Sequence, residues 1–333
     1  MGSPGPGQNT QAQAVTRLAP SPTGALHPGN ARTFLVNWAL ARQRGWRVIL
    51  RIEDLDTPRV KPGAVDETID TLRWLGLDWD DEAPLQTADL TPYRDAMSTL
   101  ANLGVVYPCE LSRAQIEAAA SAPNEGDHEQ RFPPELRPAS FRQGKPTGFD
   151  RAEVNWRLAV EPGLVAFDDA FAGPQSRDVA RTVGDFVLWT KRGQPSYQLA
   201  VVVDDARRGI TEVVRGDDLL GSAARQILLY RLLGLGPTPR YTHLPLVRGP
   251  DGRRLAKRHG DTRLTHYRAL GVPAERIIGL IASWSGVAGP ARAMSARGFT
   301  EAFDISTMPR HDITFTEAHE RWLIRGTPPE HDT

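Results

Sequence analysis

Residues 17–30 read RLAPSPTGALHPGN, and this stretch decides the fold that we expect. The apolar segment Val15–Ala19 is typical of a short strand, and the Pro, Ser and Gly residues that follow it indicate a turn-rich loop. Apolar residues then recur at helical spacing, with Asn30 as a plausible N-cap and Gly45 where the helix should end. Because Trp46–Ile52 has the β-branched character of a second strand, the order predicts the opening unit of a parallel α/β fold.

The remaining patterns divide the chain into a catalytic domain, an insertion and a helical end. Further helices are expected at Val65–Leu75, Tyr93–Leu103, Asp218–Leu233, Leu264–Leu270, Ala274–Trp284 and Thr316–Ile324. Strands are expected at Val154–Val160, Leu164–Phe167, Phe186–Trp189, Ser196–Val203, Ile210–Val214 and His243–Val247. Together they predict a disordered tail at 1–14, a Rossmann-type parallel sheet at 15–106 and 185–252, an inserted α+β subdomain at 107–184, and a basic loop with a short helical region at 253–333.

The composition describes a globular chain whose contacts with nucleic acid must be local. Hydrophobic residues make up 40% of the 333 residues, which supports a sizeable buried core. Forty basic and forty acidic residues give a net charge of zero, so global charge does not attract RNA. Arginines cluster at 207–208 and within 248–258, where a solvated face is the simpler interpretation.

Cysteine usage and hydropathy favour the cytoplasm. Cys109 is the only cysteine, which excludes an intramolecular disulfide and suits a reducing compartment. Residues 1–14 contain no Lys or Arg and no apolar run, so they do not resemble a secretory signal. The most apolar stretch, Ile277–Ala288, is too short to cross a bilayer. We therefore expect a cytoplasmic protein without membrane contact.

The loop quoted first carries a recognisable motif. Its end, His27-Pro28-Gly29-Asn30, resembles the His-Ile-Gly-His element of class I aminoacyl-tRNA synthetases of the glutamyl type. Glycine permits close approach by a nucleotide, a helix N-terminus favours phosphate, and histidine supplies a donor as charge builds on the α-phosphate. The resemblance implies that His27, Gly29 and Asn30 bind ATP and that His27 is catalytic. Asn30 departs from the second histidine of the element.

A second motif lies far downstream. Residues 254–258 read RLAKR and resemble the Lys-Met-Ser-Lys-Ser loop of the same enzymes. The resemblance implies that Arg254 and Lys257 bind ATP and that Lys257 is catalytic, neutralising the departing pyrophosphate. Ala256 replaces a serine and removes a hydroxyl. Either motif alone is an ordinary turn or surface loop, but the two in this order favour the family.

Further positions match the residues with which the family binds its amino acid. Arg17 and Arg215 offer planar guanidinium forks for carboxylates, and Glu53 can pair with an α-ammonium. The resemblance implies a glutamate site formed by Arg17, Ala19, Ser21, Glu53, Tyr197 and Arg215. Two structural interpretations stay open: Arg17 and Glu53 form an ion pair between neighbouring strands, and Tyr197 belongs to a half-buried core.

The length of the chain distinguishes between two families of glutamyl-type synthetase. Only 76 residues follow Lys257, too few for the large helical anticodon-binding domain of a discriminating glutamyl-tRNA synthetase. The chain instead resembles the glutamyl-Q tRNA(Asp) synthetase family over nearly all of residues 15–326. That family activates L-glutamate with ATP and Mg²⁺ without tRNA and transfers it to queuosine in the anticodon of tRNA(Asp). By this resemblance residues 107–184 bind the acceptor, residues 253–333 contact an RNA stem, and the protein is expected to be a monomer.

Zinc is expected to be absent. Many members of that family hold zinc in the insertion through several cysteines and a tyrosine, whereas this chain has Tyr107-Pro108-Cys109 there and no cysteine in Phe132–Leu136. One thiolate cannot build a structural tetrahedral site. We therefore expect no protein-bound metal, a packed or half-exposed Cys109, and an insertion held by apolar contacts such as those of Phe132 and Leu136.

Three other functions stay open at this point. The nearest is a truncated glutamyl-tRNA synthetase that charges the 3′ end of tRNA(Glu). A catalytically silent paralogue that binds glutamate or RNA would tolerate Ala256 and Asn30. A nucleotidyltransferase acting on another acid would use the same loops, although Arg17, Glu53 and Arg215 favour an amino acid with a second carboxylate.

Overall fold

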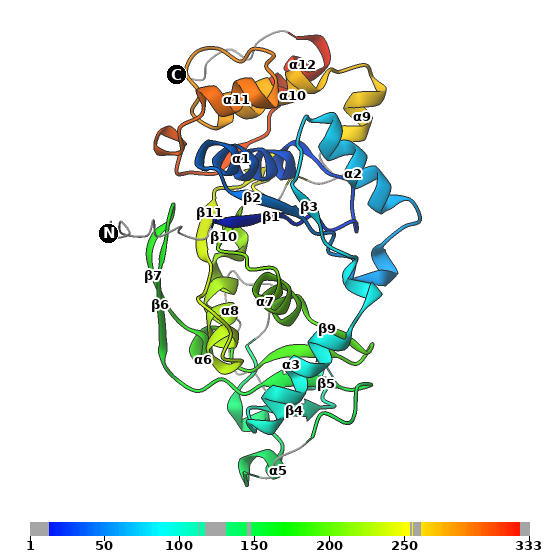
Figure 1. The fold of residues 1–333 in the computed structure, drawn as a ribbon, viewed down its shortest axis with the longest axis vertical. Helices are drawn as coiled ribbons and strands as arrows, with labels where there is room; N and C mark the ends of the chain where they lie inside the picture. The colour runs from blue at the N-terminus through cyan, green and yellow to red at the C-terminus, as the bar shows by residue number, and fades with distance from the viewer. Residues whose placement is uncertain are drawn as a thin grey trace, which may run out of the picture.

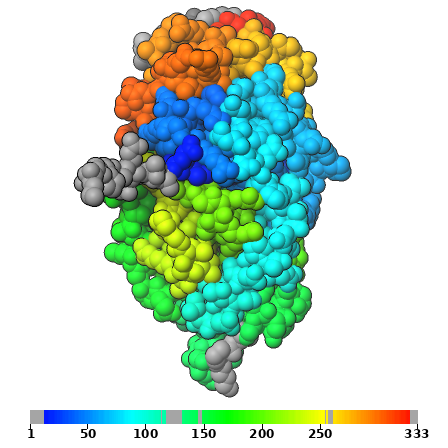
Figure 2. Space-filling view, in the orientation of Figure 1, coloured from blue at the N-terminus to red at the C-terminus, as the bar shows by residue number. Residues whose placement is uncertain are grey.

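The computed structural model describes residues 13–112, 114–116, 131–144, 148–253, 255 and 261–326. A parallel sheet crosses the middle of an elongated molecule (Figure 1). Helix α1 (Pro28–Arg44) and the C-terminal helices lie on one side of the sheet, and α7 (Tyr197–Arg207) and α8 (Leu220–Leu232) lie on the other. The antiparallel sheet that includes β4 (Val106–Cys109) and β5 (Asn155–Leu158) forms the end opposite the C-terminal helices, whereas the hairpin of residues 164–178 runs along one side (Figure 1 and Figure 2). The predicted Rossmann-type α/β class is confirmed.

The central sheet consists of two parallel ladders that meet at β1. In the first, β1 (Val15–Leu18) pairs with β2 (Arg47–Leu50) and β2 pairs with β3 (Asp81–Glu82). In the second, β10 (Glu212–Gly216) pairs with β11 (Arg240–Leu244). The Thr211 amide donates to the Val15 carbonyl at 2.9 Å and joins the ladders. Parallel pairing places the carboxyl ends of neighbouring strands at one edge, where ligands of such sheets bind.

The alternation along β2 explains the two layers. Val48 and Leu50 are buried in the cluster that contains the apolar face of α1, whereas Ile49 is buried in the cluster that contains α7 and α8. Side chains of successive strand residues point to opposite faces, so this strand is covered on both.

Helix α1 begins earlier than the sequence predicts. His27 is its N-cap, with extended backbone, and the His27 Nδ1 accepts from the Gly29 and Asn30 amides at 3.1 and 3.3 Å. The Asn30 Oδ1 accepts from the His27 amide at 3.2 Å, so Asn30 is the third helical residue and its assignment as N-cap is wrong. Pro28 at the first helical position fits because its missing N–H needs no partner there. Gly45 ends the helix in the left-handed region (φ 66°), as predicted.

One predicted strand is a helix. Ser196–Val203 was expected to be extended, but Tyr197–Arg207 form α7, with Ser196 as N-cap. The run Leu199–Val203 is buried on every side, between the insertion sheet and α8. An all-apolar run of this length has no helical period, so a fully buried helix cannot be told from a buried strand by pattern alone.

A second expected strand, His243–Val247, is divided. β11 ends at Leu244, and β12 (Val247–Arg248) pairs instead with β13 (Ile313–Thr314). Pro245 stands at the break because it has no N–H for a ladder. Its carbonyl accepts from the buried Arg32 of α1 at 2.7 Å.

The other predicted helices are confirmed within a few residues. They are α2 (Ala64–Trp74), α3 (Thr91–Asn102), α8, α9 (Leu264–Ala269), α10 (Ala274–Trp284) and α12 (Glu317–Arg325). The prediction omitted α11 (Ala296–Ala302) and α6 (Val179–Thr182), which are too short to show a helical period. Short 3₁₀ helices lie at Thr57–Arg59, Gln86–Ala88, Pro134–Leu136, Asp217–Leu219 and Ile305–Thr307. The described part of the chain contains no helix with the length and apolar character of a membrane span.

The expected insertion, residues 107–184, contains a hairpin and shares an antiparallel sheet with the segment that follows it. The sheet has the order β4 (Val106–Cys109), β5 (Asn155–Leu158), β8 (Phe186–Thr190) and β9 (Gln194–Pro195), so its last two strands lie beyond residue 184. The hairpin pairs β6 (Leu164–Asp169) with β7 (Gly173–Asp178), and β6 also reaches β11 where Asp169 lies opposite Tyr241. α5 (Ala139–Arg142) lies at the far end of the molecule.

A small apolar cluster holds this end of the molecule together. Cys109 is buried with Tyr107, Ile116 and Phe132, and Leu136 packs against them. The predicted packing of Cys109 and the apolar contacts of Phe132 and Leu136 are therefore confirmed. The Tyr107 hydroxyl also donates to the buried carboxylate of Asp185 at 2.5 Å.

Candidate active site

The expected glutamate-binding residues lie at or just beyond the carboxyl ends of β1, β2 and β10, and at the first turn of α7. The Arg51 amide donates to the Leu18 carbonyl at 2.9 Å, and the Glu53 amide donates to the Pro20 carbonyl at 3.0 Å. These bonds continue the β1–β2 ladder beyond both strands. They hold the loop with half-buried Ala19 and exposed Ser21 beside Glu53.

Four charged side chains form a buried cluster beneath this loop. Arg51 contacts Asp205 through one guanidinium nitrogen and Glu53 through the other, at 3.0 Å to Oε1. Arg17 Nε lies 3.5 Å from the same Asp205 carboxylate. The expected strand-to-strand ion pair between Arg17 and Glu53 is thus wrong in its partners, because Arg51 pairs with Glu53 and Asp205 lies against Arg17. Burying such charges is tolerable only when they are paired.

The pKa values follow from this pairing. Burial lowers the pKa of the Arg51 guanidinium, but the carboxylates of Asp205 and Glu53 raise it by more. The net pKa is above the ordinary value, so the group is always charged. Burial raises the pKa of the Glu53 carboxyl above its usual range, although Arg51 and Arg17 oppose the shift. A carboxylate held partly desolvated gains from a further positive partner, such as an ammonium group.

Arg17 retains hydrogen-bonding capacity. It is 4% exposed, yet within the described part of the chain its guanidinium makes no hydrogen bond. Buried polar groups in folded proteins are nearly always hydrogen-bonded, so a buried fork without acceptors is typical of a ligand site. A carboxylate is the group that such a fork accepts best.

Arg215, at the end of β10, is held from several sides. Its Nε donates to the His243 Nε2 at 2.9 Å, and one terminal nitrogen donates to the Gln226 Oε1 at 2.9 Å. The same nitrogen lies 3.5 Å from the Tyr197 hydroxyl, and the other donates to the Leu219 carbonyl at 3.3 Å. The guanidinium also lies over the Tyr241 ring, 5.2 Å from its centroid.

Tyr197 connects these groups. Its side chain is 36% exposed, so the ring is only partly buried. Its phenol pKa is raised, first by desolvation and then by Glu53, while Arg215 and Arg17 lower it. The hydroxyl therefore lies within electrostatic reach of all three charged residues predicted to bind glutamate. Arg17, Glu53, Tyr197 and Arg215 converge on one place.

His27 faces the opposite end of the same loop. Because its Nδ1 accepts the two capping bonds, a neutral His27 ring carries its proton on Nε2. A β-carbon on Gly29 would lie 3.0 Å from the His27 Cε1 and 3.1 Å from the Val247 Cβ. A residue without a β-carbon is therefore needed at position 29 for the His27 ring to lie between α1 and β12. Asn30 serves the capping box with its side chain.

The second motif lies mostly outside the described residues. Arg254 and Lys257 are among those not described, and so is Ala256. The preceding turn is described: the Gly249 amide donates to the Arg253 carbonyl at 2.8 Å, directly after β12. β12 in turn touches the Gly29 position, so this turn leaves the sheet next to the His27 motif.

Sequence reasoning missed the partners that hold the predicted residues. Arg51, Asp205, His243, Asp169 and Gln226 are all at most 5% exposed. One signal was available: Asp204 and Asp205 follow three valines in a buried segment, where carboxylates need partners. The Asp204 carboxylate accepts from the Tyr93 hydroxyl and from Gln86 at 3.0 and 2.7 Å. Apart from Arg51 and Glu53, which are two positions apart, these pairings join residues separated by at least 11 positions.

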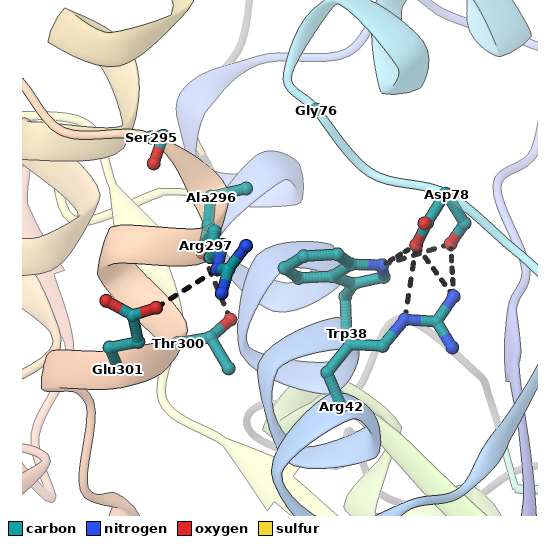
Figure 3. Close-up of a pocket in the computed structure, with 9 residues that line it drawn as sticks. All are labelled: Trp38, Arg42, Gly76, Asp78, Ser295, Ala296, Arg297, Thr300 and Glu301. Atoms are coloured by element: carbon teal, nitrogen blue, oxygen red, sulfur yellow. Dashed lines mark hydrogen bonds and ion pairs between the residues drawn. The ribbon is translucent and has the colours of Figure 1, made fainter.

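A separate hollow lies elsewhere, between α1, α11 and the turn after α2 (Figure 3). Its volume is about 540 Å³, and it includes none of the predicted site residues. Its charges are already paired, because Arg42 binds Asp78 at 2.7 Å and Arg297 binds Glu301 at 3.1 Å. Within the described ranges no group of three or more His, Cys, Asp or Glu side chains is arranged to hold a metal ion.

Comparisons with known proteins agree with this geometry. Residues 13–319 match the family model of tRNA synthetases class I (E and Q), catalytic domain. A glutamyl-Q tRNA(Asp) synthetase of Rhodopirellula baltica is 47% identical over 285 residues, which cover 83% of this chain and 86% of that protein. One of Symbiobacterium thermophilum is 44% identical over 327 residues, which cover 93% of this chain and 98% of that protein.

The structural comparison gives the same class of protein. A crystal structure of glutamate-tRNA synthetase from Elizabethkingia anophelis superposes with a TM-score of 0.75 at 25% identity, covering 93% of this chain and 70% of that chain. All of the described site residues fall inside the segment matched by the family model.

Proposed function

Because the chain belongs to the glutamyl-Q tRNA(Asp) synthetase family of class I tRNA synthetases, we propose that it activates L-glutamate with MgATP in the absence of tRNA and transfers the glutamyl group to queuosine in the anticodon of tRNA(Asp). The magnesium ion enters as part of the nucleotide substrate. No covalent protein intermediate is needed, since positioning and charge stabilisation suffice for phosphoryl and adenylyl transfer.

The observation that carries the proposal is the convergence of Arg17, Glu53, Tyr197 and Arg215 at the carboxyl edge of the sheet. Glutamate has two carboxylates and one ammonium, and the cluster offers two guanidinium groups and one carboxylate. Arg17 has unused donors, and Arg215 is fixed from behind. We assign Arg215 to the γ-carboxylate, Glu53 to the α-ammonium, and Tyr197 with the loop at Ala19 and Ser21 to orienting the substrate.

In the first step an α-carboxylate oxygen of glutamate attacks the α-phosphorus of ATP. The bond from that phosphorus to the bridging oxygen breaks, and pyrophosphate leaves with the electron pair. The Nε2–H of His27 stabilises the α-phosphate, and the positive N-terminal end of the α1 dipole favours the anion. Gly29 and Asn30 hold His27 in place. Arg254 and Lys257 neutralise the leaving pyrophosphate.

In the second step a hydroxyl of the cyclopentene ring of queuosine attacks the acyl carbon of glutamyl-adenylate. The acyl–oxygen bond to AMP breaks, and an ester forms. The ring presents vicinal hydroxyls much as a terminal ribose does. The antiparallel sheet of the insertion and the C-terminal helices would supply the surfaces for the RNA.

ATP–pyrophosphate exchange without tRNA tests the first step. We expect exchange with glutamate and little with glutamine or aspartate, because only glutamate places a second carboxylate at Arg215. Lys257→Ala should lower the exchange rate more than it raises the KM for glutamate. A wild-type protein that exchanges nothing would favour a silent glutamate- or RNA-binding paralogue, and equal loss in rate and binding would remove Lys257 from its role.

A further inference from the structure

Behind Arg215 lies a buried chain of two more polar residues. The His243 Nε2 accepts from the Arg215 Nε at 2.9 Å, and the His243 Nδ1 lies 2.6 Å from the Asp169 Oδ2. His243 and Asp169 have no solvent-exposed side-chain surface. Neither residue has a role in the reaction steps described above. Burying a charged carboxylate costs free energy unless the carboxylate is hydrogen-bonded or paired.

The protonation states follow from the donors and acceptors. The Arg215 Nε always carries a hydrogen, so the His243 Nε2 must present its lone pair. The remaining proton of a neutral ring is then on Nδ1 and points at Asp169. Burial lowers the pKa of His243, which keeps the ring neutral. Burial raises the pKa of Asp169, but hydrogen bonds from His243 and from the Ala172 amide outweigh it, so this carboxyl stays ionised.

Asp169 is fixed by the backbone as well as by His243. Its Oδ1 accepts from the amides of Phe171 and Ala172 at 3.0 and 2.7 Å, within the turn of the β6–β7 hairpin. The same oxygen accepts from the His243 amide at 3.1 Å, across to β11. The carboxylate therefore has one oxygen for the backbone and one for the imidazole.

We propose that Asp169 and His243 are positioning residues that orient the Arg215 guanidinium toward the γ-carboxylate of the substrate. The proposal rests on the function proposed above and deepens it, because it names the residues by which Arg215 selects an amino acid substrate with an acidic side chain. Asp169 fixes the tautomer of His243, His243 fixes the Nε edge of Arg215, and Gln226 and Leu219 hold its terminal nitrogens.

The geometry explains why the arginine needs such support. Of the five N–H groups of a guanidinium, four on Arg215 have partners within the described residues. The longest of these contacts, 3.5 Å to the Tyr197 hydroxyl, is on the open side of the site. A guanidinium that rotated about its stem would present a different edge there. The fifth N–H and the one that faces Tyr197 are the donors left for a carboxylate, and their direction depends on the orientation of the whole group.

Asp169→Asn is the sharpest perturbation. An asparagine keeps an oxygen for the Phe171, Ala172 and His243 amides, but its NH₂ faces the His243 Nδ1. The ring must then accept there and carry its proton on Nε2, against the Arg215 Nε–H. The same change of tautomer follows an Asp-to-Asn substitution in the catalytic triad of serine proteases. We expect the KM for glutamate in exchange to rise at least tenfold, with the KM for ATP changed less than threefold.

A rescue variant and a control separate this role from general loss of structure. His243→Gln places an amide oxygen near the position of Nε2, so it accepts from Arg215 whatever stands at 169. Adding Asp169→Asn to His243→Gln should therefore cost less than threefold in the KM for glutamate. Asp185→Asn removes a similarly buried carboxylate next to the insertion, since Asp185 is 1% exposed and Asp169 is 3% exposed. It should lower the melting temperature without raising that KM.

The tautomer gives a readout that does not depend on activity. In ¹⁵N-histidine-labelled protein, His243, identified by its loss in His243→Gln, should carry its proton on Nδ1 in the wild type and on Nε2 in Asp169→Asn. An unchanged tautomer, or an unchanged KM for glutamate in Asp169→Asn, would overturn the proposal that Asp169 and His243 orient Arg215. If the wild type showed no glutamate-dependent exchange, the proposed function would fail, while the tautomer measurement would still decide whether Asp169 controls His243.

Discussion

Gly29→Ala tests whether the position of the His27 ring limits the adenylation rate. The added β-carbon would lie 3.0 Å from the His27 Cε1, 3.1 Å from the His27 Nδ1 and 3.1 Å from the Val247 Cβ. Ordinary carbon contacts begin near 3.5 Å, so the ring must move by a few tenths of an ångström. The Val247 side retreats with difficulty, because Val247 is 5% exposed and its strand is paired to β13.

Two opposing terms set the effect on stability. Alanine in place of glycine in a helix gains up to about 1 kcal/mol, less at the first turn. Overpacking costs about 1–3 kcal/mol, and weakening the His27 cap costs about 1 kcal/mol more. We expect a net loss of about 1–2 kcal/mol, which leaves the protein folded at room temperature.

The same shift should slow catalysis. A displaced ring moves the Nε2–H away from the α-phosphate, and misplacement of a catalytic group by about 1 Å can cost about 10²-fold in rate. A shift of a few tenths of an ångström should therefore lower the kcat of ATP–pyrophosphate exchange by roughly 3- to 10-fold, with the KM for glutamate nearly unchanged. Gly24→Ala is the matched control, because its β-carbon would meet nothing within 4 Å. If Gly29→Ala and Gly24→Ala catalysed exchange at similar rates, the claim that the position of the His27 ring limits adenylation would be refuted.

Three further outcomes follow from the buried charges and from the insertion. Arg51→Met removes a buried cation that pairs with Asp205 and Glu53, and should lower the free energy of unfolding by about 3–5 kcal/mol. Arg297→Ala breaks an exposed ion pair and should lower it by less than about 1 kcal/mol. Urea denaturation of both variants measures the difference. Because the pKa of Glu53 is raised in the folded protein, it takes up a proton at a higher pH than a free carboxyl group does, so the KM for glutamate should rise as the pH falls through that raised value. Glu53→Gln should have a high KM that no longer follows this titration; a wild-type KM that is flat toward acid pH would count against the pairing with the ammonium. Metal analysis of protein purified without chelators should find no stoichiometric zinc, since Cys109 is the only thiol, and one zinc per chain would contradict the prediction.

The sequence was sufficient for elements whose signals are local. The loop before α1 and the glycine that ends the helix are read directly from neighbouring positions. Of the six residues expected to converge, Arg17, Glu53, Tyr197 and Arg215 interact electrostatically in the structure, whereas Lys257 lies outside the described residues. Parallel topology explains why strand ends meet at one edge. The chemistry expected of these residues came from the resemblance of the two motifs to those of class I synthetases.

The rest depends on contacts between distant segments. Arg51 meets Asp205 across 154 positions, and His243 meets Asp169 across 74, so neither pairing has a local signature. α7 was mistaken for a strand because burial on all sides removes the helical period. His27 was not recognised as an N-cap because an imidazole is an uncommon capping group, whereas the neighbouring Asn30 is of a preferred type. Tertiary packing decided the two pairings and α7, whereas the cap at His27 is a local feature of an uncommon type.

The central claim is that the chain makes glutamyl-adenylate on its own and delivers it to queuosine. The direct measurement is transfer of labelled glutamate, by the wild-type protein with MgATP, to tRNA(Asp) that contains queuosine, to tRNA(Asp) that lacks it, and to tRNA(Glu). We expect label only on the queuosine-containing tRNA(Asp), and we expect that label to be lost when the cyclopentene diol is oxidised with periodate before the reaction. Label on the 3′ end of tRNA(Glu), or equal label on both forms of tRNA(Asp), would contradict it.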